Sequence, residues 1–437
     1  MRPLVILRPA LVAALACAAL ACAPPVARAA APGAADTAAA THTGPPAKNT
    51  CYDCHRTLDD PRLSGPTKEF PQDIHATHGL GCVGCHGGNP DDPEMTAMDP
   101  DKGFKGAPAR KDIAELCASC HANAGYMKRY NPQPYIFSMA EFRTSVHCKK
   151  ISEGDLKVAT CTNCHGVHGI LPPRDPRSPV YHANVPFTCA KCHNADYMKG
   201  RTVPTNQLAL WRASVHGVAL LDKGDMSAPA CNNCHGNHGA VPPKTRDISV
   251  VCGNCHGREG ELFAKSKVAE MLEFEGKRGC VTCHSNHGIQ PPSDAMVGLG
   301  GDGLCGRCHA SGSNGDRAAA AIVPSFHAFK SHLARADSLL GVADRLGVET
   351  ASGHEVLKQA NDALVGLRAT LHSFSRPTIE AALAEGEGFA GHAEAQAREA
   401  LRDWRNRRLG MALSLGVILV LMGLLVARIR RVDRRPA

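Results

Sequence analysis

Residues 142–173 read FRTSVHCKKISEGDLKVATCTNCHGVHGILPP, and they contain the pattern that organises this chain. A Ser-Val-His triplet at residues 145–147 precedes a Cys-x-x-Cys-His motif at residues 161–165. Residues 211–243 repeat the same order, with WRASVH before CNNCHGNHGAVPP. A repeat of this kind predicts a chain assembled from similar short units.

The Cys-x-x-Cys-His motif occurs nine times, and we number the copies 1 to 9 in chain order. This spacing is typical of c-type haem attachment, in which two thiols form thioethers to the porphyrin and the histidine binds the iron. Zinc ribbons and a disulfide framework are the alternatives, but a zinc ribbon uses two cysteine pairs per metal and no histidine after each pair. The sequence therefore predicts nine covalently bound haem c groups. The predicted thioether cysteines and proximal histidines are Cys51, Cys54 and His55; Cys82, Cys85 and His86; Cys117, Cys120 and His121; Cys161, Cys164 and His165; Cys189, Cys192 and His193; Cys231, Cys234 and His235; Cys252, Cys255 and His256; Cys280, Cys283 and His284; and Cys305, Cys308 and His309.

Fourteen histidines lie outside the nine motifs and are candidates for the second axial position of the irons. Those that recur at fixed places in the repeat are the strongest, with a propionate hydrogen bond or a solvent-facing role as the alternative. His75 and His78 compete for one role, and we favour His78. The predicted distal ligands are His78, His147, His168, His216, His238 and His287.

The third copy of the repeat departs from this pattern, because Val268 stands where the earlier copies have histidine. Three histidines in the later part of the chain could reach back to fill this vacancy, although a solvated helix face is an equally good explanation for each. They are His327, His332 and His372.

The expected fold is mainly α with little regular structure. The motifs span 259 residues, about 29 residues for each haem, which is too little polypeptide to build an apolar core around each one. The porphyrins would then form the core, in a leading haem followed by four two-haem units. We expect a nine-haem domain at residues 51–317 and a helical segment at residues 318–408, where cysteine disappears and apolar residues recur every three to four positions.

The two ends of the chain carry targeting signals. Residues 1–29 resemble a secretory signal peptide, with an early Arg, an apolar stretch and an Ala-Arg-Ala cleavage pattern, and residues 30–50 are expected to form a flexible arm. A lipoprotein role for Cys22 is the alternative. Residues 409–427 contain no charge and are long enough for a transmembrane helix, a buried core helix being the alternative. Because haem c is attached outside the cytoplasm, the tail at residues 428–437 is expected in the cytoplasm.

The formal net charge of +8 owes much to the arginines that flank the apolar stretch. These arginines favour contact with anionic lipid headgroups. No nucleic acid is expected as a partner, because no motif combines aromatic and basic residues.

The order SVH, then CxxCHGxHGxxPP, then a further CxxCH resembles the periplasmic multihaem c-type cytochromes, including class III-like cytochromes and relatives of membrane-anchored quinol dehydrogenases and hydroxylamine-oxidoreductase-like proteins. The resemblance covers residues 51–309 and implies stacked haems with mostly bis-histidine iron. The anchor here is C-terminal, whereas such quinol dehydrogenases usually have an N-terminal one. The CxxCK motif of cytochrome c nitrite reductases is absent from the sequence.

We therefore expect an electron-transfer protein of the cytoplasmic membrane with its haem domain in the periplasm. It would take electrons from a quinol-linked membrane partner and pass them to periplasmic redox proteins, and no catalytic residue is expected. One alternative is an oxidoreductase that acts on a small nitrogen or sulfur compound at one open-site haem. A second is a docking subunit of a larger membrane complex.

Overall fold

The computed structural model describes residues 49–243 and 248–433. The expected signal peptide and most of the expected arm lie outside the described residues. The helices are α1 (Thr50–His55), α2 (Pro61–Glu69), η1 (Phe70–Gln72), α3 (Ile74–Thr77), α4 (Val83–His86), η2 (Met95–Met98), η3 (Pro100–Lys102), α5 (Ile113–His121), α6 (Ala124–Met127), α7 (Met139–Thr144), α8 (Val146–Ser152), α9 (Cys161–His165), η4 (His182–Asn184), α10 (Val185–Ala190), α11 (Gln207–Arg212), α12 (Val215–Gly217), η5 (Val218–Asp222), α13 (Cys231–His235), α14 (Ile248–Gly253), α15 (Gly257–Ala264), α16 (Lys267–Phe274), α17 (Gly279–His284), η6 (Asp294–Met296), η7 (Cys305–Arg307), α18 (Asn314–Arg345), α19 (Ala351–Thr370), η8 (Leu371–Ser373) and α20 (Arg376–Asp433).

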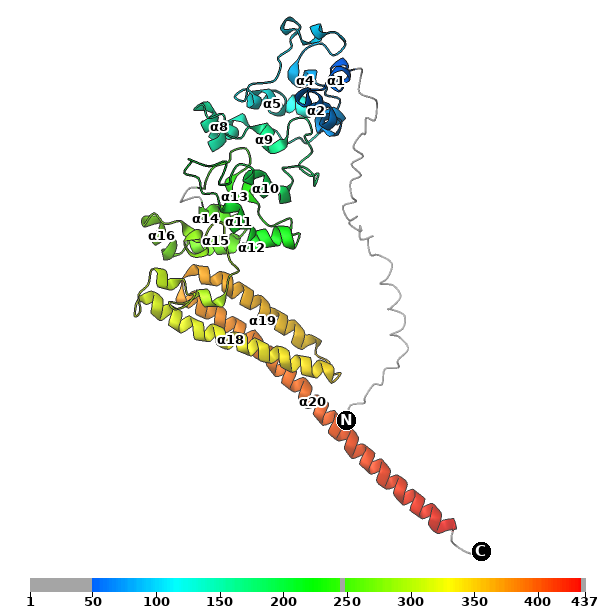
Figure 1. The fold of residues 1–437 in the computed structure, drawn as a ribbon. Helices are drawn as coiled ribbons and strands as arrows, with labels where there is room; N and C mark the ends of the chain where they lie inside the picture. Colours follow the sequence, from blue (N-terminus) through cyan, green and yellow to red (C-terminus); the bar gives the residue numbers. More distant parts are fainter. Residues whose placement is uncertain (1–48, 244–247, 434–437) are drawn as a thin grey trace, which may run out of the picture.

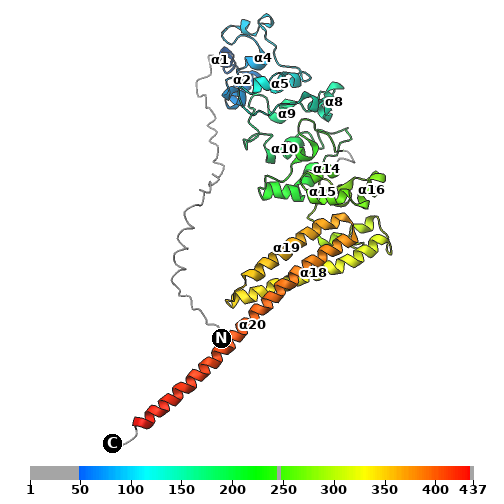
Figure 2. The ribbon, with the colours of Figure 1, turned by 180° about the vertical axis from the view of Figure 1, so that it is seen from behind.

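The described part of the chain contains helices and loops but no strand, so the predicted mainly α fold with little regular structure is confirmed. Residues 51–309, which we call the motif region, consist of short helices joined by long loops. Below them in Figure 1 lie three long helices, α18, α19 and α20, and α20 continues well beyond the other two. Figure 2 shows the same succession from behind.

The motif helices are short because the sequence stops them immediately. In α9 and α13 the motif itself is the whole helix, and the residue that follows its histidine is glycine. Gly166 and Gly236 both have a positive φ, of 86° and 83°, which glycine adopts without a steric penalty. Each chain turn therefore leaves the motif histidine at the end of a helix, directed out of the helical turn.

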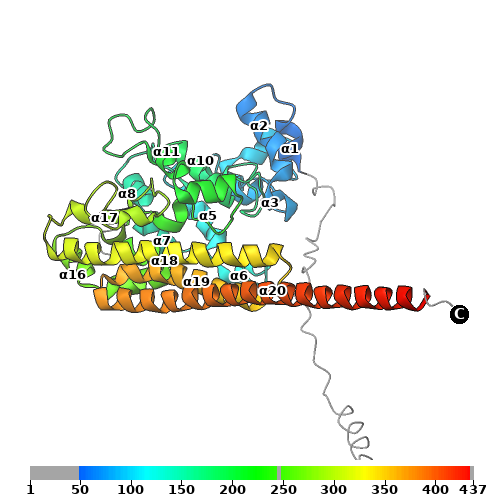
Figure 3. The ribbon, with the colours of Figure 1, turned by 90° about the horizontal axis from the view of Figure 1, so that it is seen from below.

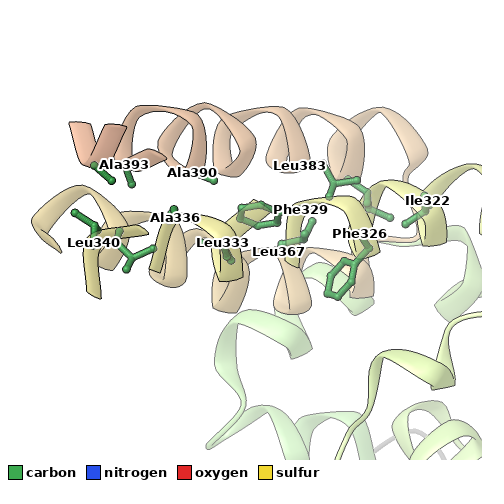
Figure 4. Packing of buried hydrophobic residues seen from close by; sticks show 14 residues of the cluster. Ile322, Phe326, Phe329, Leu333, Ala336, Leu340, Leu367, Leu383, Ala390 and Ala393 are labelled. Carbon is green, nitrogen blue, oxygen red and sulfur yellow. The ribbon is translucent and has the colours of Figure 1, made fainter. Parts of the chain in front are cut away.

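The three long helices pack around a conventional apolar core. Buried residues in α18 recur at alternating intervals of four and three residues, which is the spacing of a helix face that contacts other helices. Phe329 is fully buried at the centre of Figure 4, and its ring packs against the backbone of Gly386 in α20, where a Cβ would lie 2.6 Å from the Phe329 Cζ. The α18 face consists of Ile322, Phe326, Phe329, Leu333, Ala336 and Leu340.

Helix α20 leaves this bundle and continues alone, as Figure 3 shows from below. Its apolar side chains at residues 409–427 are exposed and pack against no other part of the chain. By length and composition, α20 is the helix in the described residues that could cross a membrane.

The bundle docks on the motif region at α15 and η6. The rings of Phe263 in α15 and Phe374 after η8 meet edge to face, with centroids 6.4 Å apart. Asp294 in η6 forms ion pairs with Lys330 of α18 at 2.5 Å and Arg368 of α19 at 3.3 Å. Burial raises the pKa of Asp294, but hydrogen bonds from these two cations outweigh it and lower the pKa below its usual value. The bundle is therefore held against the part of the motif region that includes motif 8.

Candidate haem sites

One continuous cavity runs through the motif region. Its volume is about 4550 Å³, or about 500 Å³ for each of the nine motifs, which lies in the ~300–1,000 Å³ range of a pocket for one small-molecule cofactor. Cysteines and histidines of all nine motifs line it. Because all nine motifs share this cavity, cofactors attached to them could supply the core of the motif region.

Four segments of the chain build the same local structure beside this cavity. In each, an aromatic residue lies three residues before a buried residue that caps a helix; this aromatic residue is half-buried in the first segment and buried in the other three. Two residues after the cap stands a histidine in the first three segments and a valine in the fourth. Each cap side chain accepts a hydrogen bond from a backbone N–H of the next turn, at 2.8–3.2 Å. We call these the cap segments; they are Phe70–Asp73–His75, Phe142–Ser145–His147, Trp211–Ser214–His216 and Phe263–Ser266–Val268.

Each histidine of a cap segment faces the motif histidine of the second motif after it. The ring centroids of His75 and His121 lie 5.9 Å apart, and the other two pairs are 6.4 and 6.3 Å apart. These pairs serve motifs 3, 5 and 7. They are His75 with His121, His147 with His193, and His216 with His256.

The histidine three residues after a motif faces backwards, to the motif histidine two motifs earlier. These pairs serve motifs 2, 4 and 6, and their ring centroids lie 6.0–6.2 Å apart with nearly parallel planes. They are His168 with His86, His238 with His165, and His287 with His235.

Motif 8 has no later motif pair to supply its partner, and the bundle supplies one instead. His372 in η8 faces His284 with ring centroids 6.0 Å apart. Among the three histidines that the sequence analysis offered for this role, His327 is exposed on α18, and His332 is bound by two carboxylates, Glu387 at 2.6 Å and Glu394 at 2.9 Å. The bundle therefore contributes directly to the haem-binding region.

The residues present fit haem iron. Bonds from a metal to an imidazole nitrogen are about 2.0–2.1 Å long, so two opposed imidazoles on one metal have ring centres about 6 Å apart. All seven facing pairs fall between 5.9 and 6.4 Å. In each pair one member belongs to a Cys-x-x-Cys-His motif, whose thiols lie beside the same cavity. This is the arrangement that bis-histidine ligation of a c-type haem requires.

Backbone hydrogen bonds between successive units, which we call joints, position these rings. In the three cap segments that contain histidine, the N–H of the residue after the cap donates a hydrogen bond of 2.8–3.0 Å to a backbone carbonyl of a later unit. That carbonyl belongs to the second residue after the histidine that follows a motif. The glycine between that histidine and that carbonyl lies close to the other segment, since a Cβ at Gly239 would lie 3.0 Å from the Glu141 side chain. The three bonds run from Ile74 to Ile170, from Val146 to Ala240, and from Val215 to Ile289. One joint therefore places two histidines, one for each direction along the chain.

Hydrogen bonds on one ring nitrogen leave the other free for a metal. The Nδ1 atoms of His86, His235 and His372 bond backbone carbonyls at 2.9–3.1 Å. The Nδ1 of His75 bonds the Asp73 carboxylate at 2.9 Å, and that carboxylate is itself almost fully buried. Such partners fix the tautomer and orientation of a metal-binding imidazole.

Burial favours the neutral, metal-binding form of three of the facing imidazoles, those of His121, His147 and His216. Desolvation lowers the pKa of His121, and the charge of the facing His75 lowers it further. The same two causes, in the same order, lower the pKa of His147 opposite His193 and of His216 opposite His256. The rings are therefore unprotonated and available as ligands at neutral pH.

The structure separates the two histidines that compete in the first unit. His75, the less favoured one, faces His121, whereas the ring of His78 meets the edge of Tyr130 at 5.9 Å. The spacing Phe70-x-x-Asp73-x-His75 matches that of Phe142-x-x-Ser145-x-His147 and could have separated them from sequence. His182 faces no motif histidine in the described residues, and its Nε2 bonds the Ala228 carbonyl at 2.8 Å.

Neighbouring motifs lie next to one another in the order in which they occur along the chain. Thiols of the odd motif and the following even motif hydrogen bond in three places: Cys117 with Cys161, Cys189 with Cys231, and Cys252 with Cys280. Motifs 1 and 2 are near enough for Cys82 to raise the pKa of Cys51, after burial as the main cause.

The even motifs in turn approach the next odd ones. Burial, and after it a thiol of the following motif, raises the pKa of Cys85 beside Cys120 and of Cys234 beside Cys255. Cys164 reaches a pKa of about 11 by burial and then the charge of Cys189. Burial also raises the pKa of Cys283; the nearby Arg307 lowers this pKa, and Cys305 of motif 9 raises it further. Each motif therefore lies near enough to the next one along the chain for their thiols to influence one another.

Comparison with known proteins agrees with this geometry. The family model described as Cytochrome c3 matches residues 224–310, which contain motifs 6 to 9. The chain is also 27% identical over 123 residues to the C-type polyheme cytochrome OmcC of Geobacter sulfurreducens. That match covers 28% of this chain and 14% of the relative. No solved structure matches.

These matches support a multihaem c-type cytochrome. They imply covalently bound haem c and electron transfer in general terms. The chain spans only 14% of the length of the relative that it matches, so what that relative does as a whole protein does not carry over to it. The cap segments and facing histidines extend the same arrangement to motifs 2 to 5, which lie before the region matched by the family model.

A pair of substitutions separates His75 from His78 in solution. We expect His75→Ala to convert one haem per chain from low-spin to high-spin, because the motif 3 iron loses its second imidazole. His78→Ala is the matched control and should leave the spectrum unchanged. Electron paramagnetic resonance of the two ferric variants measures both outcomes. A high-spin signal from His78→Ala alone would show that His78 is the ligand.

Proposed function

We propose that this chain is a nine-haem electron-transfer protein, anchored in the cytoplasmic membrane by α20 with its haem domain in the periplasm. It passes electrons from a quinol-linked membrane partner to periplasmic redox proteins. Haem c iron supplies one-electron redox chemistry, with a potential set by its axial ligands and surroundings. The proposed distal ligands are His75, His147, His168, His216, His238, His287 and His372.

The observation that carries this proposal is the unbroken series of motif contacts. Electron transfer along a protein needs carriers that are close neighbours from one end to the other. Each motif thiol contact, such as that of Cys117 with Cys161, places the edges of two attachment sites together. The seven opposed histidine pairs leave most irons without an exchangeable position, which favours transfer of electrons over conversion of a substrate.

The bundle gives the series a direction relative to the membrane. His372 belongs to η8, which directly precedes α20, and it faces motif 8. The late motifs therefore lie nearest to the bundle and motif 1 lies at the far end, as Figure 1 shows. We infer that electrons from a membrane partner enter near motifs 8 and 9 and leave toward motif 1.

The proposed topology follows from the haem sites and α20 together. Haem attachment outside the cytoplasm, with a cleaved signal peptide at residues 1–29, puts the motif region in the periplasm. The stretch at residues 409–427 then crosses the membrane, and the arginine-rich tail from residue 428 remains in the cytoplasm, where basic residues flanking a span are favoured.

The membrane and quinol parts of the proposal are tested with the full-length protein in membranes. Membrane vesicles that contain it are supplied with a membrane-soluble quinol, and haem reduction is followed by absorbance. We expect reduction by the quinol, followed by reoxidation when membrane-impermeant ferricyanide reaches the periplasmic face. Failure of quinol to reduce haems that dithionite reduces would contradict the proposed electron source.

A matched control removes the anchor without touching the motifs. Val417→Arg with Leu421→Arg puts two charges into the middle of the apolar stretch, at a cost of about 2.5–3.5 kcal/mol each at the centre of a span. This variant should keep its haems, move to the soluble fraction, and lose reduction by quinol. Membrane retention of the variant would show that α20 is not the anchor.

A further inference from the structure

The fourth cap segment repeats the structure of the other three but lacks their histidine. Ser266 is buried, its hydroxyl accepts a hydrogen bond from the Ala269 N–H at 3.1 Å, and it donates to the Phe263 carbonyl at 2.7 Å. Ser214 makes the same two bonds, with Gly217 and Trp211. The backbone at residue 268 is therefore placed as it is at the histidines of the other cap segments, and Val268 occupies the position.

The repeat identifies which motif loses its partner. Each histidine of a cap segment faces the second motif after it, as His216 faces His256 of motif 7. From Val268 the second motif is motif 9, and Val268 and His309 line the same cavity. In the described part of the chain no aromatic or imidazole ring faces His309. The valine side chain has no atom that can bind iron.

Other donors near motif 9 are differently engaged. The Lys277 ammonium lies 4.0 Å from the Cys308 sulfur, but it pairs with Glu275 at 2.6 Å. His327 of α18 lines the same cavity, but it is exposed, and in the described residues its ring does not face that of His309. Met271, one helical turn after Val268, lines the cavity and is 37% exposed. Val268, Met271 and Leu272 are the α16 residues that line this cavity, and they form a largely apolar wall without an imidazole.

We propose that the haem site of motif 9 keeps one exchangeable face, lined by Val268, that binds small neutral ligands such as carbon monoxide or nitric oxide. This inference rests on the proposed nine-haem function. The apolar wall favours uncharged diatomic molecules over anions, because a buried anion would have no partner on Val268. Since motif 9 ends the series nearest the bundle, a molecule bound there sits at one terminus of the electron path.

The experiment is a titration of the dithionite-reduced, full-length protein with carbon monoxide. We expect the native protein to bind carbon monoxide, and Val268→His, which gives this cap segment the histidine of the other three, to bind one equivalent less per chain. The ferric Val268→His protein should also lose one high-spin signal. Glu270→His, on the exposed side of the same helix, is the matched control and should bind carbon monoxide as the native protein does.

Haem content measured on every variant keeps the outcomes separate. Val268→Met offers a thioether, also a haem ligand, in a smaller change and should lose the equivalent as well. Native protein with nine haems that binds no carbon monoxide would overturn the inference but leave the proposed function intact. So would undiminished binding in Val268→His, which would place the open iron elsewhere, for example at His55, which no ring faces in the described residues.

Two further variants test the remaining donors. Met271→Leu and His327→Ala should each leave carbon monoxide binding at the level of the native protein, because neither residue binds the iron in this account. An additional equivalent in either variant would identify that residue as a native ligand. If that new equivalent then disappeared on adding Val268→His, the residue would be the ligand of motif 9 itself and the inference would be wrong.

Discussion

Replacing Cys161 and Cys164 together by alanine is expected to divide the haem series into two parts that no longer exchange electrons rapidly. Motif 4 contacts motif 3 through Cys161 and Cys117, and motif 5 through Cys164 and Cys189. Without its haem, motifs 3 and 5 are separated by the full width of one site. Motifs 5 to 9 remain connected to the bundle, whereas motifs 1 to 3 are isolated.

Stopped-flow reduction by quinol in membranes measures this division. The variant should carry eight haems, of which five are reduced rapidly and three remain oxidised until dithionite is added. The matched control, Cys51→Ala with Cys54→Ala, removes a haem from the far end, so all eight remaining haems should be reduced rapidly. Rapid reduction of all eight in the motif 4 variant would show that electrons do not follow the order of the motifs.

Replacing His372 by alanine is expected to have the second-largest effect, because this residue joins the bundle to the site of motif 8. Its ring faces His284 at 6.0 Å, and its Nδ1 bonds the Ala369 carbonyl at 3.1 Å, which leaves Nε2 for the iron. The variant should lose one low-spin haem and gain one equivalent of carbon monoxide binding. Added imidazole should restore the low-spin state.

His354 provides the matched control for His372. It lies near the start of α19, pairs with Asp344 at 2.9 Å, and is about half exposed. His354→Ala should leave the haem spectrum and carbon monoxide binding unchanged. If His372→Ala also leaves the spectrum unchanged, the contact between the bundle and motif 8 is packing alone, made by Phe263 and Phe374 and by the ion pairs of Asp294.

The sequence was sufficient to predict the helical, loop-rich fold, because the spacing of the motifs leaves too little chain for an apolar core at each one. It also placed five histidines at recurring positions that the structure brings opposite motif histidines. Which motif each of them faces could not be predicted, since the pairing skips one motif in either direction. That pairing depends on the backbone joints, such as Ile74 with Ile170, which have no signature of their own in the sequence.

Two residues show why local pattern reasoning stopped short. His75 was less favoured than His78 because both lie close to motif 2, and only the position of the Asp73 cap separates them. His372 has no repeat partner, and its role depends on how the bundle docks against α15. Tertiary packing of this kind is set by contacts between distant segments, here Phe263 with Phe374. By contrast, Val268 was visible as an irregularity, and the structure indicates the motif that it affects.

The central claim is a nine-haem series in which opposed histidine pairs hold most of the irons. Spin-quantified electron paramagnetic resonance of the ferric protein, with its haem content measured on the same sample, tests it most directly. The account predicts nine haems per chain, of which at least seven are low-spin with two histidine ligands. Fewer than seven such irons in a protein with all nine haems attached would contradict it.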